Sequence, residues 1–363
     1  MLKNIAPIDI MNWHSNFKGT RRAYGSQAIH EYPFYAHHGV FDGNLDSHLS
    51  HTSRFIDAKQ PGAGFFIFIN QIAKPAVPIF IFISGFLLHS IYRGKPLSPL
   101  AYWLKRLPKL IIPYVIWSIG YYLIYMKMGY YPLDFKFVIK GILLGTFIYH
   151  LYFMVIIIQF YILYPLLHYV ATKVGENLTF ILILVLQIGL ITVPFEWRDR
   201  LFITYFSYFG LGILMSVQLQ NLSRICKPYV LHFLIFLCVG GLNALLFFNG
   251  QNGWLALPSI MNSLFYVIFS IISILSLLFG FEGLSAIVSL KDHSKLRITK
   301  LGDATQLIYY AHPLFILGSE YMMNQLGVMS ISVRALSALL SILFLLVPLS
   351  YLLKANLVKL KVS

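Results

Sequence analysis

Charged side chains are scarce in this sequence. Asp, Glu, Lys and Arg together make up 11% of its 363 residues, whereas soluble domains contain about a quarter. This deficit excludes an ordinary soluble fold, because too few charged groups remain to cover a water-exposed surface. Hydrophobic residues instead reach 58%, and the mean hydropathy is +0.71. The composition predicts an all-α, polytopic integral membrane helix bundle, since long apolar runs cross bilayers as helices.

Acidic residues and cysteines are also few. Thirteen Asp and Glu stand against 28 Lys and Arg, which gives a formal net charge of +15. In a soluble protein this excess would suggest a nucleic-acid partner, but here the bases gather between apolar runs, where they orient helices. We therefore expect a lipid bilayer and no nucleic acid as partner. The two cysteines, Cys226 and Cys238, indicate neither a disulfide framework nor a metal site.

Residues 1–63 lack both a periodic apolar face and a signal peptide, so we expect a poorly ordered polar tail. Six of the twelve histidines fall within it. Their spacings fit no standard zinc pattern and no cysteine joins them, so we expect no metal. These histidines are His14, His30, His37, His38, His48 and His51.

Nine apolar runs approach the roughly 20 residues that a helix needs to cross a bilayer. They lie near 65–89, 110–127, 150–170, 178–195, 201–217, 229–248, 258–280, 302–319 and 333–353. The stretch 136–148 is short and amphipathic, which favours an interfacial or re-entrant helix. These runs predict one membrane domain over 64–356 and a short tail over 357–363.

Lys and Arg are unevenly divided between the two alternating sets of connecting loops. The larger set contains Arg93, Lys95, Lys105, Arg106, Lys109, Lys173, Arg224, Lys227, Lys291, Lys295, Arg297, Lys300, Lys354, Lys359 and Lys361. The smaller set contains Lys127, Lys136, Lys140, Arg198, Arg200 and Arg334. The positive-inside rule places the larger set, and with it the C-terminus, in the cytoplasm. With nine spans, the tail over 1–63 would then lie outside.

The stretch KPAVPIFIFISGFLL, residues 74–88, is an unusual membrane span. Lys74 lies near the outer end, where its ammonium can reach the headgroups. Pro75 and Pro78 fall in the first turns, where freed backbone groups can bond to water or neighbours. Ser84 and Gly85 form a small surface that another helix, or a substrate, can approach closely. Helix packing and a substrate cavity at Lys74, Ser84 and Gly85 both stay open.

Four stretches, in order along the chain, carry a family resemblance. They are AVPIFIFISGFLL (76–88), YWLKRLPKLIIPYVIWS (102–118), HLYFMVIIIQFYILYPLL (150–167) and LGDATQLIYYAHPLF (301–315). Together they resemble the membrane-bound acyltransferase 3 family over about residues 55–355. The resemblance implies about ten transmembrane helices. It also implies transfer of an acetyl- or succinyl-type group from cytoplasmic acyl-CoA to a cell-surface polysaccharide or lipid-linked glycan.

Two histidines are candidates for catalysis. His150 begins one predicted span, and His312 lies inside another. A neutral imidazole can act as general base on a sugar hydroxyl, because its ordinary pKa is ~6.5. The alternative is a histidine that is hydrogen-bonded across a helix interface. His89, His168 and His232 are better interpreted as interfacial residues.

A basic cluster stands at the start of the span 110–127. Lys105, Arg106 and Lys109 are candidates for binding the phosphates of CoA, because Lys and Arg suit a polyanion; Arg106 is the first choice. The alternative is a topological anchor that also meets anionic lipid. The sequence does not choose between these interpretations.

The N-terminal region departs from the family pattern. The family's first helix carries an arginine, ten intervening residues and a histidine. Here APIDIM (6–11) resembles the start of that helix, but Asn12 occupies the position of the arginine and a polar run follows it over 12–54. The family's catalytic pair therefore has no counterpart.

Two other functions stay open. A polysaccharide exporter or flippase also has many spans and basic inner loops. Ion-coupled transporters tend to have two similar halves and buried carboxylates, whereas here the acids lie almost wholly in the tail and loops, with Asp303 nearest to a span. The second alternative is an inactive acyltransferase relative that has lost its first helix.

A local change of reading frame would explain a polar run flanked by family-like sequence. On this hypothesis, one of the other two frames across codons 10–60 would encode an apolar helix with an arginine and a histidine eleven positions apart. Sequencing the gene over this region and translating all three frames tests this. If neither frame encodes such a helix, residues 12–54 are genuine.

Overall fold

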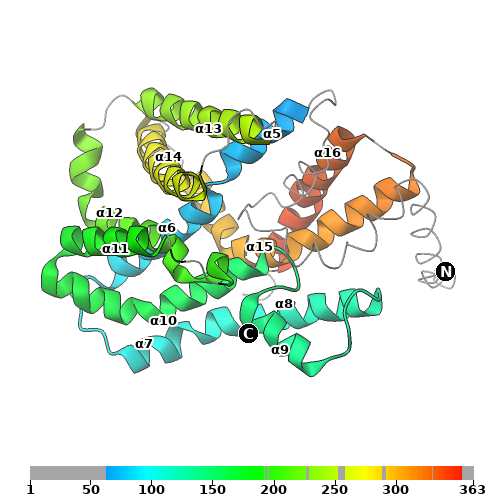
Figure 1. Ribbon diagram of the computed structural model, residues 1–363, viewed down its shortest axis with the longest axis horizontal. Coiled ribbons are helices and arrows are strands. Elements are labelled where there is room, and N and C mark those ends of the chain that lie inside the picture. The colour runs from blue at the N-terminus through cyan, green and yellow to red at the C-terminus, as the bar shows by residue number, and fades with distance from the viewer. Residues whose placement is uncertain are drawn as a thin grey trace.

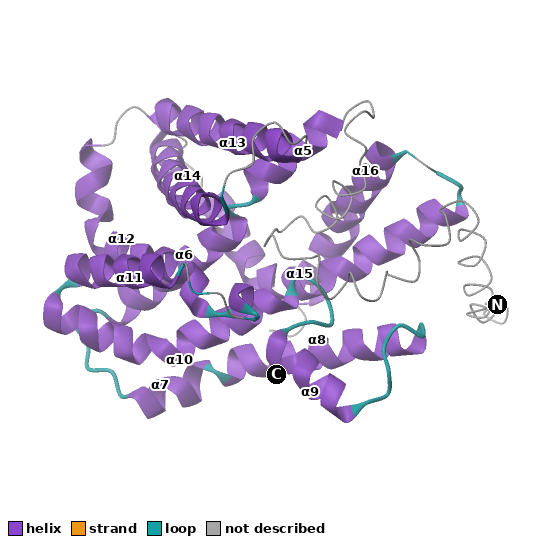
Figure 2. Cartoon of the chain, in the orientation of Figure 1, coloured by secondary structure: helices purple, strands orange, loops and turns teal. Residues whose placement is uncertain are grey.

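The computed structural model describes residues 63–191, 193, 196–225, 229–251, 258–287, 292–328 and 330–353. Within these ranges every regular element is a helix (Figure 2). The main helices are α5 (Ala63–Ala73), α6 (Ala76–Tyr92), α7 (Pro99–Arg106), α8 (Pro108–Lys127), α9 (Phe135–Leu144), α10 (Leu151–Val174), α11 (Glu176–Leu190), α12 (Phe206–Ile225), α13 (Tyr229–Gln251), α14 (Ser259–Ile287), α15 (Asp292–Gln325) and α16 (Ile331–Ser341). Two short 3-10 turns, η1 (Arg198–Arg200) and η2 (Phe202–Tyr205), precede α12, and a π-helical turn, η3 (Ile342–Leu346), follows α16. The predicted tail over 1–63, except Ala63, and the segment 357–363 lie outside the described residues.

Seven segments of the described chain are long and apolar enough to cross a membrane. They are Phe68–Tyr92, Pro99–Lys127, Leu151–Val174, Phe202–Leu219, Val230–Gly250, Ile260–Gly280 and Ser332–Leu353. These correspond to seven of the nine predicted spans, and the prediction of a polytopic all-α membrane protein is confirmed. The predicted span 178–195 is the shorter apolar helix α11, and 302–319 lies inside α15, which is not among the seven.

The outer surface of the bundle is apolar. Leu104, Ile116, Val185 and Val230, on four different helices, are 63–70% exposed. In water, so extensive an apolar surface would drive association. In a bilayer the same side chains face hydrocarbon, so the surface fits a protein that is embedded in lipid.

The helix break at Lys74 and Pro75 separates α5 from α6. Pro75 has no N–H and stands immediately before α6. Pro78 falls in the first turn of α6, where a backbone N–H would have no helical partner, so it is tolerated there. The two halves then pack on different helices: α5 lies against α13, and α6 lies against α12 (Figure 1).

The closest helix contact joins α6 to α12. A Cβ atom at Gly85 would lie 2.3 Å from the Phe209 carbonyl oxygen, and one at Gly212 would lie 2.2 Å from the Phe82 carbonyl oxygen. Only glycine allows two backbones to approach so closely. The main core forms around this crossing. It is completed by α10, where the Phe160 ring stacks on Phe209 with centroids 4.5 Å apart.

Helix α10 connects two cores. Figure 1 shows it running between α11 and α12 on one side and α7 and α8 on the other. Its C-terminal part packs in the main core. Its first turns belong to a second, tyrosine-rich cluster that joins α8, α9 and the middle of α15 through Tyr121, Phe147, Leu151 and Tyr310. Any group at the start of α10 therefore lies where these four helices meet.

The bundle has two distinguishable ends. We call one the basic end: it consists of residues 93–98 and the turn between α10 and α11, and it carries Arg93, Lys95 and Lys173. The opposite end consists of residues 145–150 and 197–205. Helix α10 runs from the opposite end to the basic end.

Replacing Gly85 by alanine should lower the melting temperature in detergent micelles. The added methyl group meets backbone atoms of Phe209, which cannot move aside as a flexible side chain can, and such overpacking costs about 1–3 kcal/mol. Gly120→Ala on α8 is the matched control, because nothing lies within 4 Å of its Cβ position. There, alanine should leave stability unchanged or raise it by about 0.5–1 kcal/mol. Equal melting temperatures for the two variants would contradict the proposed crossing.

Candidate functional site

The fold brings together the two histidines that are candidates for catalysis. His150 stands immediately before α10, and His312 lies in α15. Their ring centroids are 5.0 Å apart, with an interplanar angle of 63°. Two residues from distant parts of the chain therefore form one imidazole pair.

His150 is buried with free hydrogen-bonding capacity. Its side chain is 6% exposed, and neither ring nitrogen has a hydrogen-bond partner among the described residues. The rings of Tyr121, Tyr149 and Tyr309 pack around it, with centroids 5.0–5.7 Å away. Buried polar atoms are normally paired. Both nitrogens thus remain available for a ligand or a proton.

His312, in contrast, uses both ring nitrogens. Nδ1 lies 2.7 Å from the Tyr309 carbonyl oxygen, and Nε2 lies 3.1 Å from the Tyr149 hydroxyl. A carbonyl oxygen can only accept, so Nδ1 carries the proton and donates it. Nε2 is then the acceptor, and the Tyr149 hydroxyl donates to it. These two hydrogen bonds fix the orientation of the His312 ring.

A small cavity lies beside the pair. It has a volume of about 20 Å³ and is lined by both histidines together with Val77, Phe80, Tyr149, Tyr152, Phe153 and Tyr309. This is enough room for a single water molecule. A hydroxyl group of a substrate is of the same size, and it would meet the free nitrogens of His150.

The turn before α10 is held by its own sequence signals. Asp134 caps α9 by accepting a hydrogen bond from the Lys136 N–H at 2.9 Å. Gly145 ends α9 with φ of 64°, the left-handed conformation that favours glycine. A Cβ there would lie 2.7 Å from backbone atoms of Tyr152. The Tyr309 hydroxyl donates to the His150 carbonyl oxygen. These contacts fix the start of α10, and with it His150.

A buried arginine supports the same turn. Arg200 is 3% exposed, and its guanidinium donates to the Leu144 and Gly145 carbonyl oxygens at the C-terminus of α9. A cation is favourable at a helix C-terminus. The guanidinium carbon also lies 5.9 Å from the ring centroid of Tyr152, which lines the cavity. Arg200, which belongs to η1, therefore helps to position Tyr152 and the turn before α10 at the cavity.

The three residues predicted to line a substrate cavity are not among those that line the histidine cavity. Gly85 packs against the backbone of α12, and the Ser84 hydroxyl donates to the Phe80 carbonyl oxygen at 3.0 Å. These contacts fit the helix-packing interpretation. Lys74 is half-buried, with Nζ 5.1 Å from the ring centroid of Phe247. A substrate-cavity role for the three residues stays a prediction.

The basic cluster divides into two kinds of residue. Lys105 and Lys109 are exposed. Arg106 is half-buried, and its Nε–H donates to the Tyr92 hydroxyl at 3.2 Å. The Tyr92 and Tyr102 rings pack edge to face beside it. The two lysines thus present free charge, whereas Arg106 is partly engaged by tyrosine. A role in binding CoA phosphates stays a prediction for all three.

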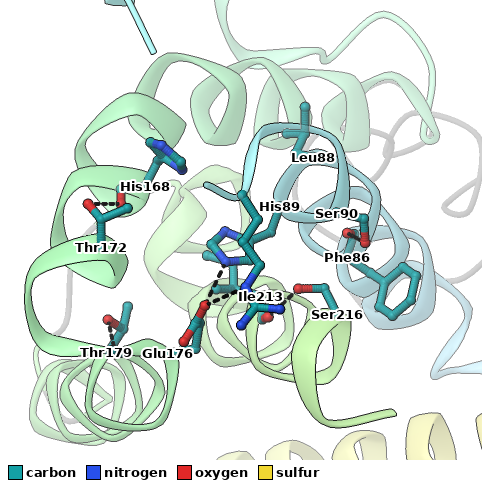
Figure 3. Close-up of polar contacts among 12 residues, drawn as sticks. Phe86, Leu88, His89, Ser90, His168, Thr172, Glu176, Thr179, Ile213 and Ser216 are labelled. Atoms are coloured by element: carbon teal, nitrogen blue, oxygen red, sulfur yellow. Dashed lines mark hydrogen bonds and ion pairs between the residues drawn. The ribbon is translucent and has the colours of Figure 1, made fainter. Parts of the chain in front are cut away.

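A second polar cluster lies at the basic end (Figure 3). His89 Nε2 and Arg93 Nε lie 3.3 and 3.2 Å from the same Glu176 carboxylate oxygen. His168 Nε2 donates to the Lys95 carbonyl oxygen at 3.3 Å, and its ring centroid is 6.1 Å from that of His89. Glu176 begins α11, so these contacts tie the ends of α6 and α10 to the start of α11. His89 and His168 are buried where these helices meet; their position at the membrane interface stays a prediction.

Sequence reasoning missed three residues of the histidine site. Tyr149 stands next to His150, and Tyr309 belongs to the stretch 301–315 that carries the family resemblance. Both positions in the sequence could have indicated that these tyrosines belong to the site. Arg200 counted only as a base in a loop. No periodicity or spacing relates it to His150, because the contact depends on how η1 folds back over α9.

Acid should weaken the contacts of Glu176. Burial raises the pKa of this carboxyl, but its backbone hydrogen bond and the contacts with His89 and Arg93 outweigh that effect, and the pKa is lowered overall. A lowered pKa means that the stabilisation is present above the ordinary value of 4.5 and is lost as the pH falls through the lowered value. Glu176→Gln should therefore reduce stability at neutral pH by about 0.5–1 kcal/mol, and the two proteins should converge in acid.

Thermal unfolding of both proteins in detergent across this pH range measures the effect. Glu196→Gln is the matched control, because that residue is exposed. A pH dependence that Glu176→Gln leaves unchanged would contradict this account.

Comparison with known proteins identifies the chain. A protein-family model described as an acyltransferase domain matches residues 47–355. No curated protein and no solved structure gives a match. The matched region includes every helix from α5 to α16 and both histidines of the site, and it confirms the resemblance over about 55–355. The chain, a multi-pass membrane protein, therefore belongs to the acyltransferase 3 family.

Proposed function

We propose that this protein transfers an acyl group, of the acetyl or succinyl type, from acyl-CoA to a hydroxyl of a cell-surface polysaccharide or lipid-linked glycan. The observation that carries this proposal is the buried pair of His150 and His312, 5.0 Å apart, in which His150 has both ring nitrogens free. A buried and unpaired imidazole is the group that acyl transfer to a hydroxyl requires.

His150 acts as the general base in this proposal. It takes the proton from the sugar hydroxyl as the oxygen attacks the thioester carbonyl, so a C–O bond forms and the C–S bond breaks. The same proton then passes to the departing thiolate of CoA. The Tyr149 hydroxyl donates its single proton to His312, so its part in this proposal is to orient His312 beside the same cavity.

The donor would enter from the basic end. The positive-inside rule favours a cytoplasmic position for that end and for the C-terminus, in the cell membrane. Lys105, at the end of α7, and Lys109, at the start of α8, are exposed and would bind the phosphates of CoA together with Arg106. The Gln306 side chain donates to the Lys109 carbonyl oxygen at 3.3 Å. His312 follows Gln306 by less than two turns of α15, about 9 Å along the axis, so an extended thioester arm could connect the two sites.

Replacing His150 by glutamine should abolish acylation without changing the amount of surface polysaccharide. Loss of a general base lowers the rate by about 10²–10⁴-fold, and glutamine preserves much of the side-chain volume. The measurement is the ester content of the polysaccharide in a deletion strain that carries each variant. His312→Gln should also reduce ester content. His232→Gln, on α13, is the control and should acylate normally.

The same strains separate the alternatives. Reduced surface polymer with unchanged ester content in the deletion strain would indicate an exporter. A wild-type gene that fails to restore esters would indicate an inactive relative. Normal ester content in the His150→Gln strain would contradict the role of His150.

A further inference from the structure

A long groove lies on α10, separate from the histidine cavity. It has a volume of about 910 Å³. One wall is α10 from Gln159 to Thr172, and the other is formed by residues 95–99 and Trp103. From Gln159 to Thr172 there are thirteen helical rises along α10, or about 20 Å at 1.5 Å per residue. The groove begins at the basic end and extends toward the opposite end, where Phe202 closes it.

The groove opens on the apolar outer surface of the bundle. Ile162 and Leu166, which line it, are 49% and 57% exposed. The two helical walls belong to Leu151–Val174 and Pro99–Lys127, which are both long and apolar enough to cross a membrane. Residues 95–98 form the turn that leads into the second of these segments. The occupant must therefore come from the lipid phase, because water gains little in an apolar groove that faces hydrocarbon.

Most polar groups along the groove bond to the protein; His168 Nδ1, which has no partner among the described residues, is an exception. Trp103 Nε1–H donates to the Ile162 carbonyl oxygen at 3.1 Å. The Gln159 amide donates to the Arg200 carbonyl oxygen and accepts from the Phe202 N–H, both at 2.9 Å. The Thr172 hydroxyl donates to the His168 carbonyl oxygen at 3.0 Å. The interior of the groove is thus chemically apolar.

Among the described residues that line the groove, lysine and arginine are found at one end only. Lys95 lines the groove at the basic end and is exposed. The Lys95 ammonium donates one hydrogen bond to the Ile91 carbonyl oxygen at 2.8 Å. Because an ammonium has three N–H donors, the other two can still bond to an anion. The cation Lys173 lies at the same end, on the last turn of α10. An anionic headgroup at Lys95 would place its chain along the groove.

We propose that the groove binds an anionic glycerophospholipid from the leaflet at the basic end. Its phosphate pairs with Lys95, and one acyl chain lies between α7 and α10 against Trp103. One leaflet contributes about half of the ~30 Å hydrocarbon core, so a single chain fits within the ~20 Å groove. The site is distinct from the proposed acyl-transfer site, and the proposal does not depend on the chain being catalytically active.

Quenching of Trp103 by brominated lipid tests this proposal. The full-length protein is reconstituted into phosphatidylcholine vesicles that contain a minority of phosphatidylglycerol, with bromine on the chains of one lipid or the other. The difference in quenching between wild type and Trp103→Phe isolates the signal of Trp103. We expect brominated phosphatidylglycerol to quench about fivefold more effectively than brominated phosphatidylcholine at equal mole fraction, which corresponds to the ~1 kcal/mol of one basic residue near an anionic surface.

Lys95→Gln should remove this preference for phosphatidylglycerol. Lys127→Gln, at the C-terminal end of α8 and away from the groove lining, should preserve it. Native mass spectrometry of the wild-type and Lys95→Gln proteins gives a second readout that does not use fluorescence. It should show phosphatidylglycerol retained by the wild type and lost from the variant. Equal quenching by the two brominated lipids, or retention that Lys95→Gln leaves unchanged, would overturn the proposal.

Discussion

The close crossing of α6 and α12 is the contact on which the rest of the bundle depends. Gly85 and Gly212 let the two backbones meet, and the apolar side chains on either side then fill a common core. Helix α10 attaches to this pair through the stacked rings of Phe160 and Phe209, and through the Tyr164 hydroxyl, which donates to the Leu88 carbonyl oxygen at 3.1 Å. Between membrane helices, where lipid is as apolar as the side chains, close packing and hydrogen bonds of this kind supply the association energy.

Anchoring α10 in this core has a consequence at its other end. The first turn of α10 projects into the tyrosine-rich cluster and presents His150 to α15. There the carbonyl oxygens of Leu144, Gly145 and His150 accept hydrogen bonds from Arg200 and Tyr309. The His150 ring itself is left unpaired. A rigid frame around one unsatisfied buried group is unfavourable for stability alone, and it is the arrangement expected of a reactive site.

The membrane-spanning pattern could be read almost entirely from composition, because each run of apolar residues must satisfy its own backbone in lipid. The predicted span 65–89 is instead divided at Lys74 and Pro75 into α5 and α6, and the short amphipathic stretch 136–148 corresponds to α9. The two remaining runs behave differently: α11 ends at Leu190, and 302–319 is one part of the 34-residue helix α15. Length and hydropathy describe a run in isolation, whereas caps and neighbouring turns decide where its helix begins and ends.

The sequence by itself determined the membrane class, the family and the two histidines worth examining, since hydropathy and local motifs are properties of short stretches of chain. It could not determine that His150 and His312 share a cavity, that Tyr149 orients His312, or that Arg200 supports the turn before α10. The sequence also left two interpretations of Gly85, helix packing and a substrate cavity. The close contact with the Phe209 backbone favours helix packing. Each of these facts depends on the relative position of helices far apart in the chain, and packing, rather than local residue preference, sets that position.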